Sequence, residues 1–315
     1  MAAIQTKSLT KRFGDVVAVR DLTFTVEEGE VFGFLGPNGA GKSTTINMLL
    51  DFMRPSGGTA TVLGRDAQRE SRLIRDRIGI LPEGYDLYGR LSGLEHLEFA
   101  IDAKDADDDP AALIDRVGLS AEDADRKVGG YSKGMTQRLA LASALVGDPD
   151  LLILDEPSSG LDPHGMAEMR EIIRGEAERG TAVFFSSHIL SEVEAVCDRV
   201  GIMNEGELVA ENTVEGLREV AGAGSQLLLD VERVPSGLDL TSIAGVSGVA
   251  VEDSTLRVSF TDPGAKARVV KRVDAAASIT DIESEEASLE ELFASYTTDD
   301  EPADGATEAP PEVSA

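Results

Sequence analysis

Apolar and polar positions along the first two thirds of the chain predict strands separated by helices. The stretch 4–30 alternates apolar and polar residues, which predicts two strands of a twisted antiparallel sheet. Continuous apolar runs predict buried strands at 30–35, 151–155 and 181–188. Apolar spacing typical of helices occurs at 44–53, across most of 91–147, and at 164–179. Because strands alternate with helices, the sequence predicts an α/β core with a mainly parallel sheet.

The composition then changes and predicts a second, smaller unit. Residues 225–296 contain three strand-like stretches, QLLLDVE, GVAVED and TLRVSF, and a helix near 264–277. Ser288 and Glu291 form a capping-box pattern that predicts a last helix. We therefore expect a separate small α+β domain over 225–296. Residues 297–315 carry no base and three Pro, so we expect a disordered acidic tail there.

The charge balance is strongly acidic. The chain contains 58 Asp and Glu against 29 Lys and Arg, a net charge of −29, and only 8 of the bases are Lys. Such a surface repels nucleic-acid phosphates, so we expect no nucleic-acid partner. The acids are spread along the chain, and we therefore hypothesise a halophilic protein that stays hydrated in a high-salt cytoplasm. The acidic stretch 102–110 is interpreted as a solvated loop, because its acids have no fixed ligand geometry.

Membrane-spanning and disulfide-bonded classes are not favoured. No apolar run approaches the ~20 residues that cross a bilayer, and residues 1–14 lack the apolar centre of a signal peptide. The single cysteine, Cys197, excludes an internal disulfide and suits a reducing cytoplasm. Cys197 is interpreted as a small buried apolar residue.

A phosphate-binding motif lies between a predicted strand and a predicted helix. The segment GPNGAGKST matches G-x-x-x-x-G-K-[ST], in which glycines let the backbone wrap with its N–H groups pointing inward. The start of the following helix adds positive potential. Lys42 would supply a charge for the β and γ phosphates, and the Ser43 hydroxyl could ligate Mg²⁺. The motif predicts a P-loop NTPase core, with nucleotide contacts at Gly36, Pro37, Asn38, Gly39, Ala40, Gly41, Lys42, Ser43 and Thr44.

Two adjacent carboxylates end the strand LLILD, although their charges repel each other. A parallel strand that ends beside the phosphate loop would place Asp155 near a bound Mg²⁺. The metal ion and Lys42 would then offset the repulsion. Glu156 would be free to polarise the attacking water as a general base.

The segment YSKGMTQRLALASALVGDPDLLILDEPSSGLD resembles the nucleotide-binding subunit of ABC transporters, and the resemblance covers roughly residues 4–220. It implies an ABC ATPase domain over 1–220 with a helical subdomain at about 84–147. Within the family's signature loop, a small polar residue and a Gly cap the γ-phosphate held by the other subunit, and here Ser132 and Gly134 match. The replacement of the usual second Gly and final Gln by Lys and Met is similar to drug-resistance or daunorubicin-type exporters.

Three further positions match this resemblance. Phe13, in KRFG, corresponds to the aromatic residue that stacks on adenine in the family, although an ordinary strand-edge Phe remains an alternative. Asp162 belongs to SGLD, which resembles the loop that communicates across the dimer. His188, after TAVFFSS, corresponds to the switch histidine that contacts the γ-phosphate.

One position departs from the family pattern. The family carries a Gln that reaches Mg²⁺ and water after the apolar strand leading into the helical subdomain, and RIGILPE places Glu83 there. A Glu oxygen can still ligate Mg²⁺, but it adds negative charge and lacks the amide donor. We treat Glu83 as a variant metal and catalytic residue. The stretch 84–95 is then expected to face the membrane partner.

The resemblance implies an ATP-binding and Mg²⁺-dependent hydrolysing subunit that drives a separate membrane permease, with export favoured. Its partners would be the permease and a second ATP-binding subunit, identical or different, at the inner face of the cell membrane. The alternative is a soluble ABC ATPase that acts on a macromolecule. Only residues 45–150 separate the two nucleotide motifs, which leaves no room for the long coiled coil of the DNA-repair members. A nonhydrolysing regulator is disfavoured by Glu156 and His188.

The charge balance also generates a prediction about stability. We expect the midpoint of urea unfolding to rise as KCl increases from dilute buffer to molar concentration, because salt screens the repulsion among the acids. Full folding in dilute buffer, with no gain from molar KCl, would contradict the halophilic hypothesis.

Overall fold

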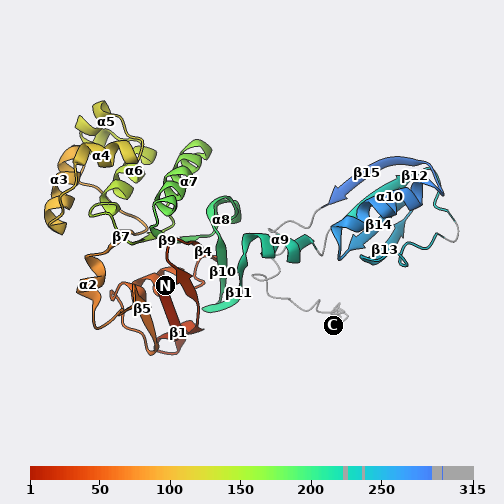
Figure 1. Cartoon of the computed structure of the whole chain (residues 1–315), viewed down its shortest axis with the longest axis horizontal. Helices are drawn as coiled ribbons and strands as arrows, with labels where there is room; N and C mark the ends of the chain where they lie inside the picture. The colour runs from red at the N-terminus through yellow and green to blue at the C-terminus, as the bar shows by residue number, and fades with distance from the viewer. Residues whose placement is uncertain (223–225, 236–237, 286–292, 294–315) are drawn as a thin grey trace, which may run out of the picture.

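The structure is a computed structural model that describes residues 1–222, 226–235, 238–285 and 293 (Figure 1). The predicted capping box at Ser288 and Glu291 and the predicted tail at 297–315 lie outside these residues. None of the described helices is both long and apolar enough to span a bilayer.

An antiparallel sheet forms from the N-terminal residues, as the alternating pattern predicted. Its longest strand, β1, pairs antiparallel with β2, β3 and β5, and β5 pairs with β6. The stretch 4–30 supplies three strands where two were expected. The strands are β1 (Ala2–Phe13), β2 (Val16–Leu22), β3 (Thr25–Glu27), β5 (Gly57–Val62) and β6 (Arg65–Asp66).

The central sheet has six strands in the order β11-β10-β4-β9-β8-β7. Neighbouring strands from β10 to β7 run parallel, which confirms the predicted α/β core, and β11 joins β10 as an antiparallel edge. The strands are β4 (Val31–Leu35), β7 (Ile78–Leu81), β8 (Leu151–Asp155), β9 (Ala182–Ser187), β10 (Arg199–Asn204) and β11 (Glu207–Thr213).

The helices cover the sheet and form an insertion between β7 and β8. The insertion holds α3 (Gly93–Lys104), α4 (Pro110–Arg116), α5 (Ala121–Asp125), η1 (Val128–Gly130) and α6 (Lys133–Ala144). The other helices are α1 (Lys42–Leu49), α2 (Ser71–Arg75), α7 (Pro163–Glu178), α8 (Leu190–Val196) and α9 (Val214–Gly222).

The acidic loop predicted at 102–110 is shorter in the structure. Helix α3 continues to Lys104, because a helical spacing of apolar residues reaches Ile101 and the chain turns only at Asp105, which has a φ of 52°. The side chain of Asp109 accepts a hydrogen bond from Ala111 N and caps α4. One of the loop acids therefore has a structural role.

The side chains of the central strands divide between two apolar cores, one on each face of the sheet. Along β8, Leu151 and Ile153 belong to one core, and Leu152 and Leu154 belong to the other. This alternation with a period of two is what a doubly covered parallel sheet requires. Every residue of β8 is buried, so the sheet is held rigidly where it ends at Asp155.

An aromatic cluster joins the antiparallel sheet to the central sheet. Phe24 precedes β3, and its ring centroid lies 5.6 Å from Phe32 and 5.8 Å from Phe184. Phe34 lies 5.2 Å from Phe184. Aromatic rings in this distance range pack favourably beyond the area that they bury. The cluster fixes the antiparallel sheet against β4, the strand that leads into the phosphate loop.

Residues 226–235 and 238–285 contain a second sheet with an apolar core of its own. The order is β13-β14-β12-β15, all antiparallel, and α10 (Lys266–Asp274) packs Val269 and Val273 into this core. The strands are β12 (Gln226–Val231), β13 (Val246–Glu252), β14 (Thr255–Phe260) and β15 (Ile279–Glu285), with η2 at Pro263–Ala265. Strand β15 was not predicted. The arrangement supports a small α+β unit, and the exact domain boundaries stay a prediction.

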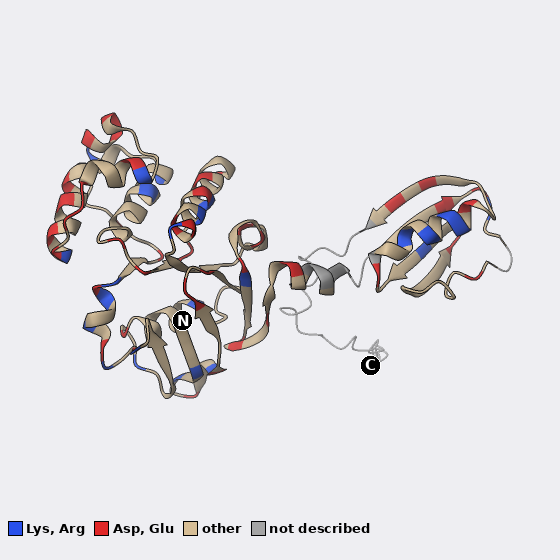
Figure 2. Ribbon diagram, viewed as in Figure 1, with Lys and Arg blue, Asp and Glu red and all other residues tan. Residues whose placement is uncertain are grey.

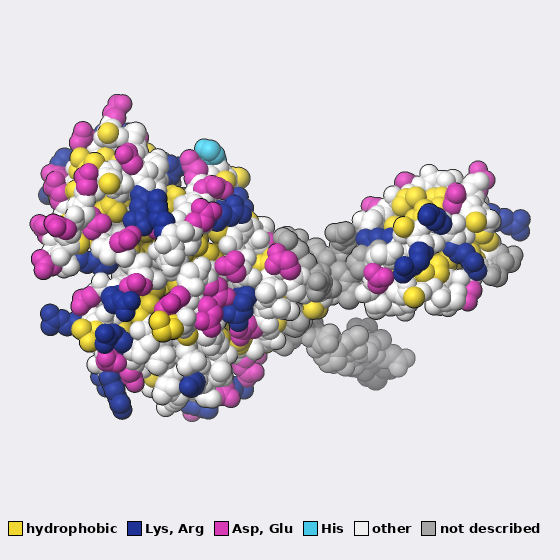
Figure 3. All heavy atoms as spheres, viewed as in Figure 1, with side chains coloured by type: hydrophobic (Ala, Val, Ile, Leu, Met, Phe, Trp, Pro, Cys, Tyr) yellow, Lys and Arg dark blue, Asp and Glu magenta, His cyan; other side chains and the backbone are white. Residues whose placement is uncertain are grey.

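Charged side chains are distributed over the described surface. Acidic and basic side chains are interspersed on the face seen in Figure 3, and the acidic ones do not gather into one patch. Lys and Arg gather on α10, as Figure 2 shows. These bases are Lys266, Arg268, Lys271 and Arg272.

The aromatic cluster generates a stability prediction. Phe184 is fully buried, so Phe184→Ala should lower the free energy of unfolding by about 3–5 kcal/mol through lost burial and a cavity. Phe52 is 61% exposed, so Phe52→Ala should change it by less than about 0.5 kcal/mol. Urea unfolding at fixed salt measures both. Equal losses of unfolding free energy in the two variants would contradict a stabilising role for the aromatic cluster.

Candidate functional site

The phosphate loop connects β4 to α1, as the sequence predicted. Gly41 has a φ of 103°, and a Cβ there would lie 2.6 Å from the carbonyl oxygen of Ala18. A Cβ on Gly36 would lie 2.5 Å from the carbonyl oxygen of Met203. Both positions therefore require glycine, because the loop is pressed against neighbouring backbone. The loop can only wrap this tightly with the residues that the motif prescribes.

Lys42 begins α1 and points into the loop. Its ammonium donates hydrogen bonds to the carbonyl oxygens of Gly36 at 2.6 Å and Pro37 at 3.3 Å. It also lies 3.4 Å from Oε1 of Glu156. Only 6% of the Lys42 side chain is exposed, so its charge acts in a poorly solvated environment.

The carboxylates of Asp155 and Glu156 diverge at the end of β8. Oδ1 of Asp155 accepts a hydrogen bond from the Ser186 hydroxyl at 2.5 Å. The same Ser186 oxygen accepts one from the backbone N–H of Glu156 at 3.1 Å. Glu156 has a φ of 51°, in the left-handed region, which turns its side chain away from the course of the strand. The predicted repulsion is relieved because the two side chains have different partners.

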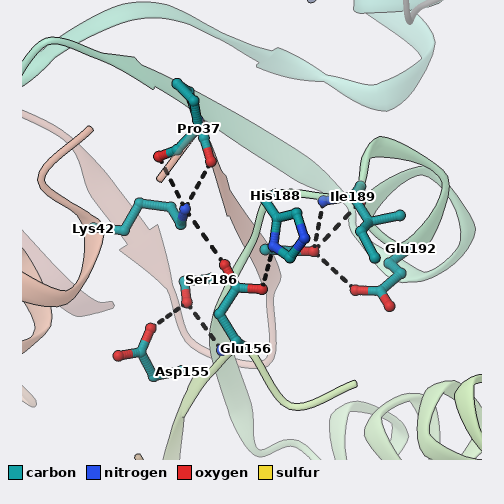
Figure 4. A network of polar contacts seen from close by, with 10 residues as sticks. Pro37, Lys42, Asp155, Glu156, Ser186, His188, Ile189 and Glu192 are labelled. Atoms are coloured by element: carbon teal, nitrogen blue, oxygen red, sulfur yellow. Dashed lines mark hydrogen bonds and ion pairs between the residues drawn. The ribbon is translucent and has the colours of Figure 1, made fainter. Parts of the chain in front are cut away.

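Glu156 lies between two groups that can carry positive charge (Figure 4). Oε2 is 2.8 Å from Nδ1 of His188, and Oε1 is the atom nearest to Lys42. Oε1 is buried and has no hydrogen-bond partner among the described residues. His188 follows β9, which lies between β4 and β8, so the strand order brings it to both the loop and the acidic pair.

Two hollows meet at these residues. One of about 300 Å³ is lined by the phosphate loop, Glu83 and Glu156. The other, of about 370 Å³, is lined by Glu83, Asp155, Glu156 and Ser159, together with residues from the start of α6. Leu81 of β7 pairs with Leu154 of β8. Glu83 lies two residues after Leu81, and Glu156 lies two residues after Leu154, so both acids reach the same hollow. The predicted Glu83, Asp155, Glu156 and phosphate loop are thus brought together.

The signature and dimer-loop residues line a different hollow, of about 380 Å³. Ser132 caps α6 by accepting from Met135 N at 3.3 Å, and Asp162 caps α7 by accepting from Gly165 N at 2.8 Å. Gly134 lies in the same hollow. These three residues are therefore together, but they are not in the hollows that contain this chain's own phosphate loop.

Phe13 is placed apart from the predicted phosphate contacts. It ends β1 at the hairpin with β2, is 48% exposed, and lies under the Lys11 ammonium, 5.0 Å from the ring centroid. Ala18, on β2, is the residue of this hairpin that lines the loop hollow. Stacking of Phe13 on adenine stays a prediction.

The oxygen groups predicted to hold Mg²⁺ are compatible with this ion. Among the described residues, no group of three His, Cys, Asp or Glu side chains forms a metal cage. Mg²⁺ is commonly held by one or two protein oxygens together with substrate phosphates, and Ser43, Asp155 and Glu83 offer oxygens only. Oε1 of Glu156, which is buried and faces Lys42, adds negative potential beside them.

Sequence reasoning missed two polar residues of this site. Ser186 connects Asp155 to Glu156, and Glu192 on α8 accepts a hydrogen bond from Ser187. Ser186 could have been suspected, because polar residues close an otherwise apolar strand in TAVFFSS. Glu192 gave no such signal, since an acid in the first turn of a helix is common.

This fold and site define a P-loop nucleotide-binding domain. The family model for "ABC transporter" matches residues 19–159. With the relatives below, this match shows that the chain belongs to the ABC transporter family.

Relatives extend the match beyond that range. An ABC transporter ATP-binding protein of Nostoc is 48% identical over 208 residues, which are 64% of this chain and 62% of that protein. A Nod factor export ATP-binding protein of Burkholderia lata is 40% identical over 70% of this chain and 73% of its own length. The linearmycin resistance ATP-binding protein of Bacillus subtilis is 32% identical over 93% of this chain and 98% of its own.

A solved structure agrees with the fold. The ATP-binding subunit of an ABC transporter superposes with a TM-score of 0.62 at 29% identity, and the match covers 69% of this chain and 92% of that one. The predicted α/β core of ABC type is therefore confirmed. The Nostoc match spans less than two thirds of that relative's length.

Proposed function

We propose that this chain is the ATP-hydrolysing subunit of an ABC exporter. The observation that carries the proposal is the position of the Glu156 carboxylate, which contacts Lys42 on one side and His188 on the other. A carboxylate held beside a phosphate loop is placed to act on water that attacks a phosphate. The family membership and the export and resistance proteins among the relatives support the same proposed function.

ATP would bind with its phosphates against the loop. The backbone N–H groups of Gly39 to Thr44 and the start of α1 favour negative charge there. Lys42 would exchange its contacts with Gly36 and Pro37 for phosphate oxygens, which are better partners for a buried ammonium. Phe13, exposed on the β1–β2 hairpin, would offer its ring face to the adenine.

Mg²⁺ would be held by Ser43 and Asp155, with Glu83 nearby, and would neutralise charge on the phosphates. The hydrogen bond from Ser186 fixes the Asp155 carboxylate, so its free oxygen keeps one direction. Glu83 carries a charge where the family has an amide. It therefore adds attraction for the cation and cannot donate a hydrogen bond to water.

Hydrolysis would use Glu156 as the general base. The water oxygen forms a bond to the γ-phosphorus, the bond from the γ-phosphorus to the bridging oxygen breaks, and the water proton passes to a Glu156 oxygen. His188 holds Oε2 of the carboxylate at 2.8 Å. Oε1, which faces Lys42 in this structure, would accept the water proton when Lys42 contacts the phosphates. Because the carboxylate is buried, its orientation costs little reorganisation during the reaction.

A second ATP-binding subunit would complete each site. Ser132, Gly134 and Asp162 gather in a hollow that does not contain this chain's phosphate loop, so we assign them to the nucleotide of the partner subunit. The start of α6, capped by Ser132, would present N–H groups to that γ-phosphate. ATP would then favour the closed pair, and hydrolysis would release it.

A membrane permease would dock near the start of the helical insertion. Tyr85, Tyr88 and Phe99 are 39%, 72% and 66% exposed, and they would offer aromatic surface to a partner. They lie in or next to the predicted contact stretch 84–95. The subunit would therefore sit at the inner face of the cell membrane through its permease.

The surface is rich in acidic side chains, with basic ones interspersed among them (Figure 3). Such a surface is compatible with a high-salt cytoplasm and disfavours a nucleic-acid partner.

The base assignment predicts the behaviour of Glu156→Gln. Phosphate release should fall by about 10²- to 10⁴-fold, because the amide cannot accept the water proton. ATP affinity should persist, and light scattering after size exclusion should detect an ATP-dependent dimer. Glu178→Gln, exposed on α7, is the matched control and should keep wild-type turnover. Near-normal hydrolysis in Glu156→Gln would reject Glu156 as the base.

The transport part of the proposal is tested separately. The chain, purified from its own cells in mild detergent, should bring down a helical membrane protein in a fixed ratio, and that protein should alter its rate of phosphate release. Recovery with ribosomes or another soluble assembly instead would favour the soluble alternative.

A further inference from the structure

A buried acid behind His188 has no role in the hydrolytic scheme above. Glu192 lies in the first turn of α8, and only 5% of the residue is exposed. Its Oε1 has no hydrogen-bond partner among the described residues. Burying a carboxylate opposes folding unless it is well paired, so the position of Glu192 calls for a physical reason.

Glu192 determines how the hydroxyl of Ser187 is oriented. The Ser187 hydroxyl donates to Oε2 of Glu192 at 2.8 Å and accepts from the backbone N–H of Ile189 at 3.0 Å. A hydroxyl has one hydrogen, so giving it to Glu192 directs a lone pair toward Ile189. Ser187 and Ile189 flank His188, and this bridge therefore fixes the backbone on both sides of the imidazole.

The bridged turn brings the imidazole to the catalytic carboxylate. Ser187 pairs with Leu35 in the parallel ladder, so one side of the turn is fixed by β4. Glu192 fixes the other side through Ile189, and Figure 4 shows the chain of contacts from Glu192 through the turn to His188 and Glu156. His188 itself is 44% exposed, so packing alone does not hold its ring.

The electrostatics of Glu192 tie it to the same centre. Burial raises the pKa of Glu192, while the hydroxyls of Ser187 and Ser158 lower it. The charge of Glu156 raises this pKa and that of His188 lowers it. Ser158 follows Glu156 by two residues, so Glu192 interacts with both segments that frame the proposed base.

We propose that Glu192 is a positioning residue for hydrolysis. Its carboxylate holds the Ser187 hydroxyl, and through it the turn around His188, so that Nδ1 meets Oε2 of Glu156. The inference rests on the proposed function only for its effect on turnover. Its geometric part concerns the contact between His188 and Glu156 and applies with no nucleotide bound.

Turnover tests the proposal through a double-mutant cycle in the full chain. Glu192→Ala should lower kcat for phosphate release about tenfold and leave KM within about twofold, because it acts on orientation and not on ATP binding. In a His188→Ala background, Glu192→Ala should lower kcat by less than about a further twofold, because the imidazole that Glu192 positions is gone. Multiplicative losses would overturn the proposal.

Two conservative variants separate positioning from folding. Glu192→Gln keeps an oxygen that accepts the Ser187 hydrogen and should retain most of kcat, whereas Ser187→Ala should lose as much as Glu192→Ala. If Glu192→Ala does not fold, this pair decides the question. Glu194→Gln, on the same helix, should keep kcat within about twofold. A loss in Glu194→Gln equal to that of Glu192→Ala would assign the effect to lost charge and overturn the proposal.

Imidazole NMR tests the geometry without hydrolysis. The chain has three His, so each ring can be assigned by substitution. Glu192→Ala should shift the His188 resonances in the same direction as Glu156→Gln does, and leave His96 and His164 unchanged. Unmoved His188 resonances in Glu192→Ala would overturn the proposal. Absent phosphate release by the wild type, with the His188 shift present, would count against the proposed function alone.

Discussion

The placement of the Glu156 carboxylate is the constraint on which the site depends. The carboxylate is buried with Lys42, and each side chain is less than one tenth exposed. Removing two charges from water is costly unless good partners remain, so a buried pair of this kind needs a rigid frame. Glu156 also adopts a left-handed backbone conformation, which costs about 1–2 kcal/mol in a residue other than Gly. Hydrogen bonds from the Glu156 N–H to Ser186 hold that conformation.

The fold supplies the frame through three adjacent parallel strands. β4 leads into the phosphate loop, β8 ends at the acidic pair, and β9 between them ends just before His188. The register pairs Asp155 with Ser186 and Leu35 with Ser187, so neighbouring backbone bonds align all three strand ends. The aromatic cluster around Phe184 and the apolar residues on the other face fix these strands from both sides. Loop, acids and histidine thus meet at one edge, where ligands of parallel sheets bind.

The sequence predicted the parallel core and most of the site because these are encoded by local patterns. Buried parallel strands are continuous apolar runs, and the phosphate loop has a fixed spacing. Strand β15 was missed because its polar residues, DIESE, resemble a loop. Ser186 and Glu192 were missed because their roles arise from pairing between β8, β9 and α8, which are distant in sequence. The gathering of Ser132 and Asp162 in one hollow, apart from this chain's own phosphate loop, likewise follows only from the folded chain.

We propose above all that Glu156 is the base for ATP hydrolysis at a site completed by a second subunit. Phosphate release per subunit, measured in saturating ATP and Mg²⁺ over a range of chain concentrations, tests it most directly. We expect the rate per subunit to rise with concentration until the pairs are complete, because Ser132 and Gly134 must come from the partner. Undetectable release, or a rate per subunit that stays constant down to concentrations where light scattering finds only single chains, would contradict it.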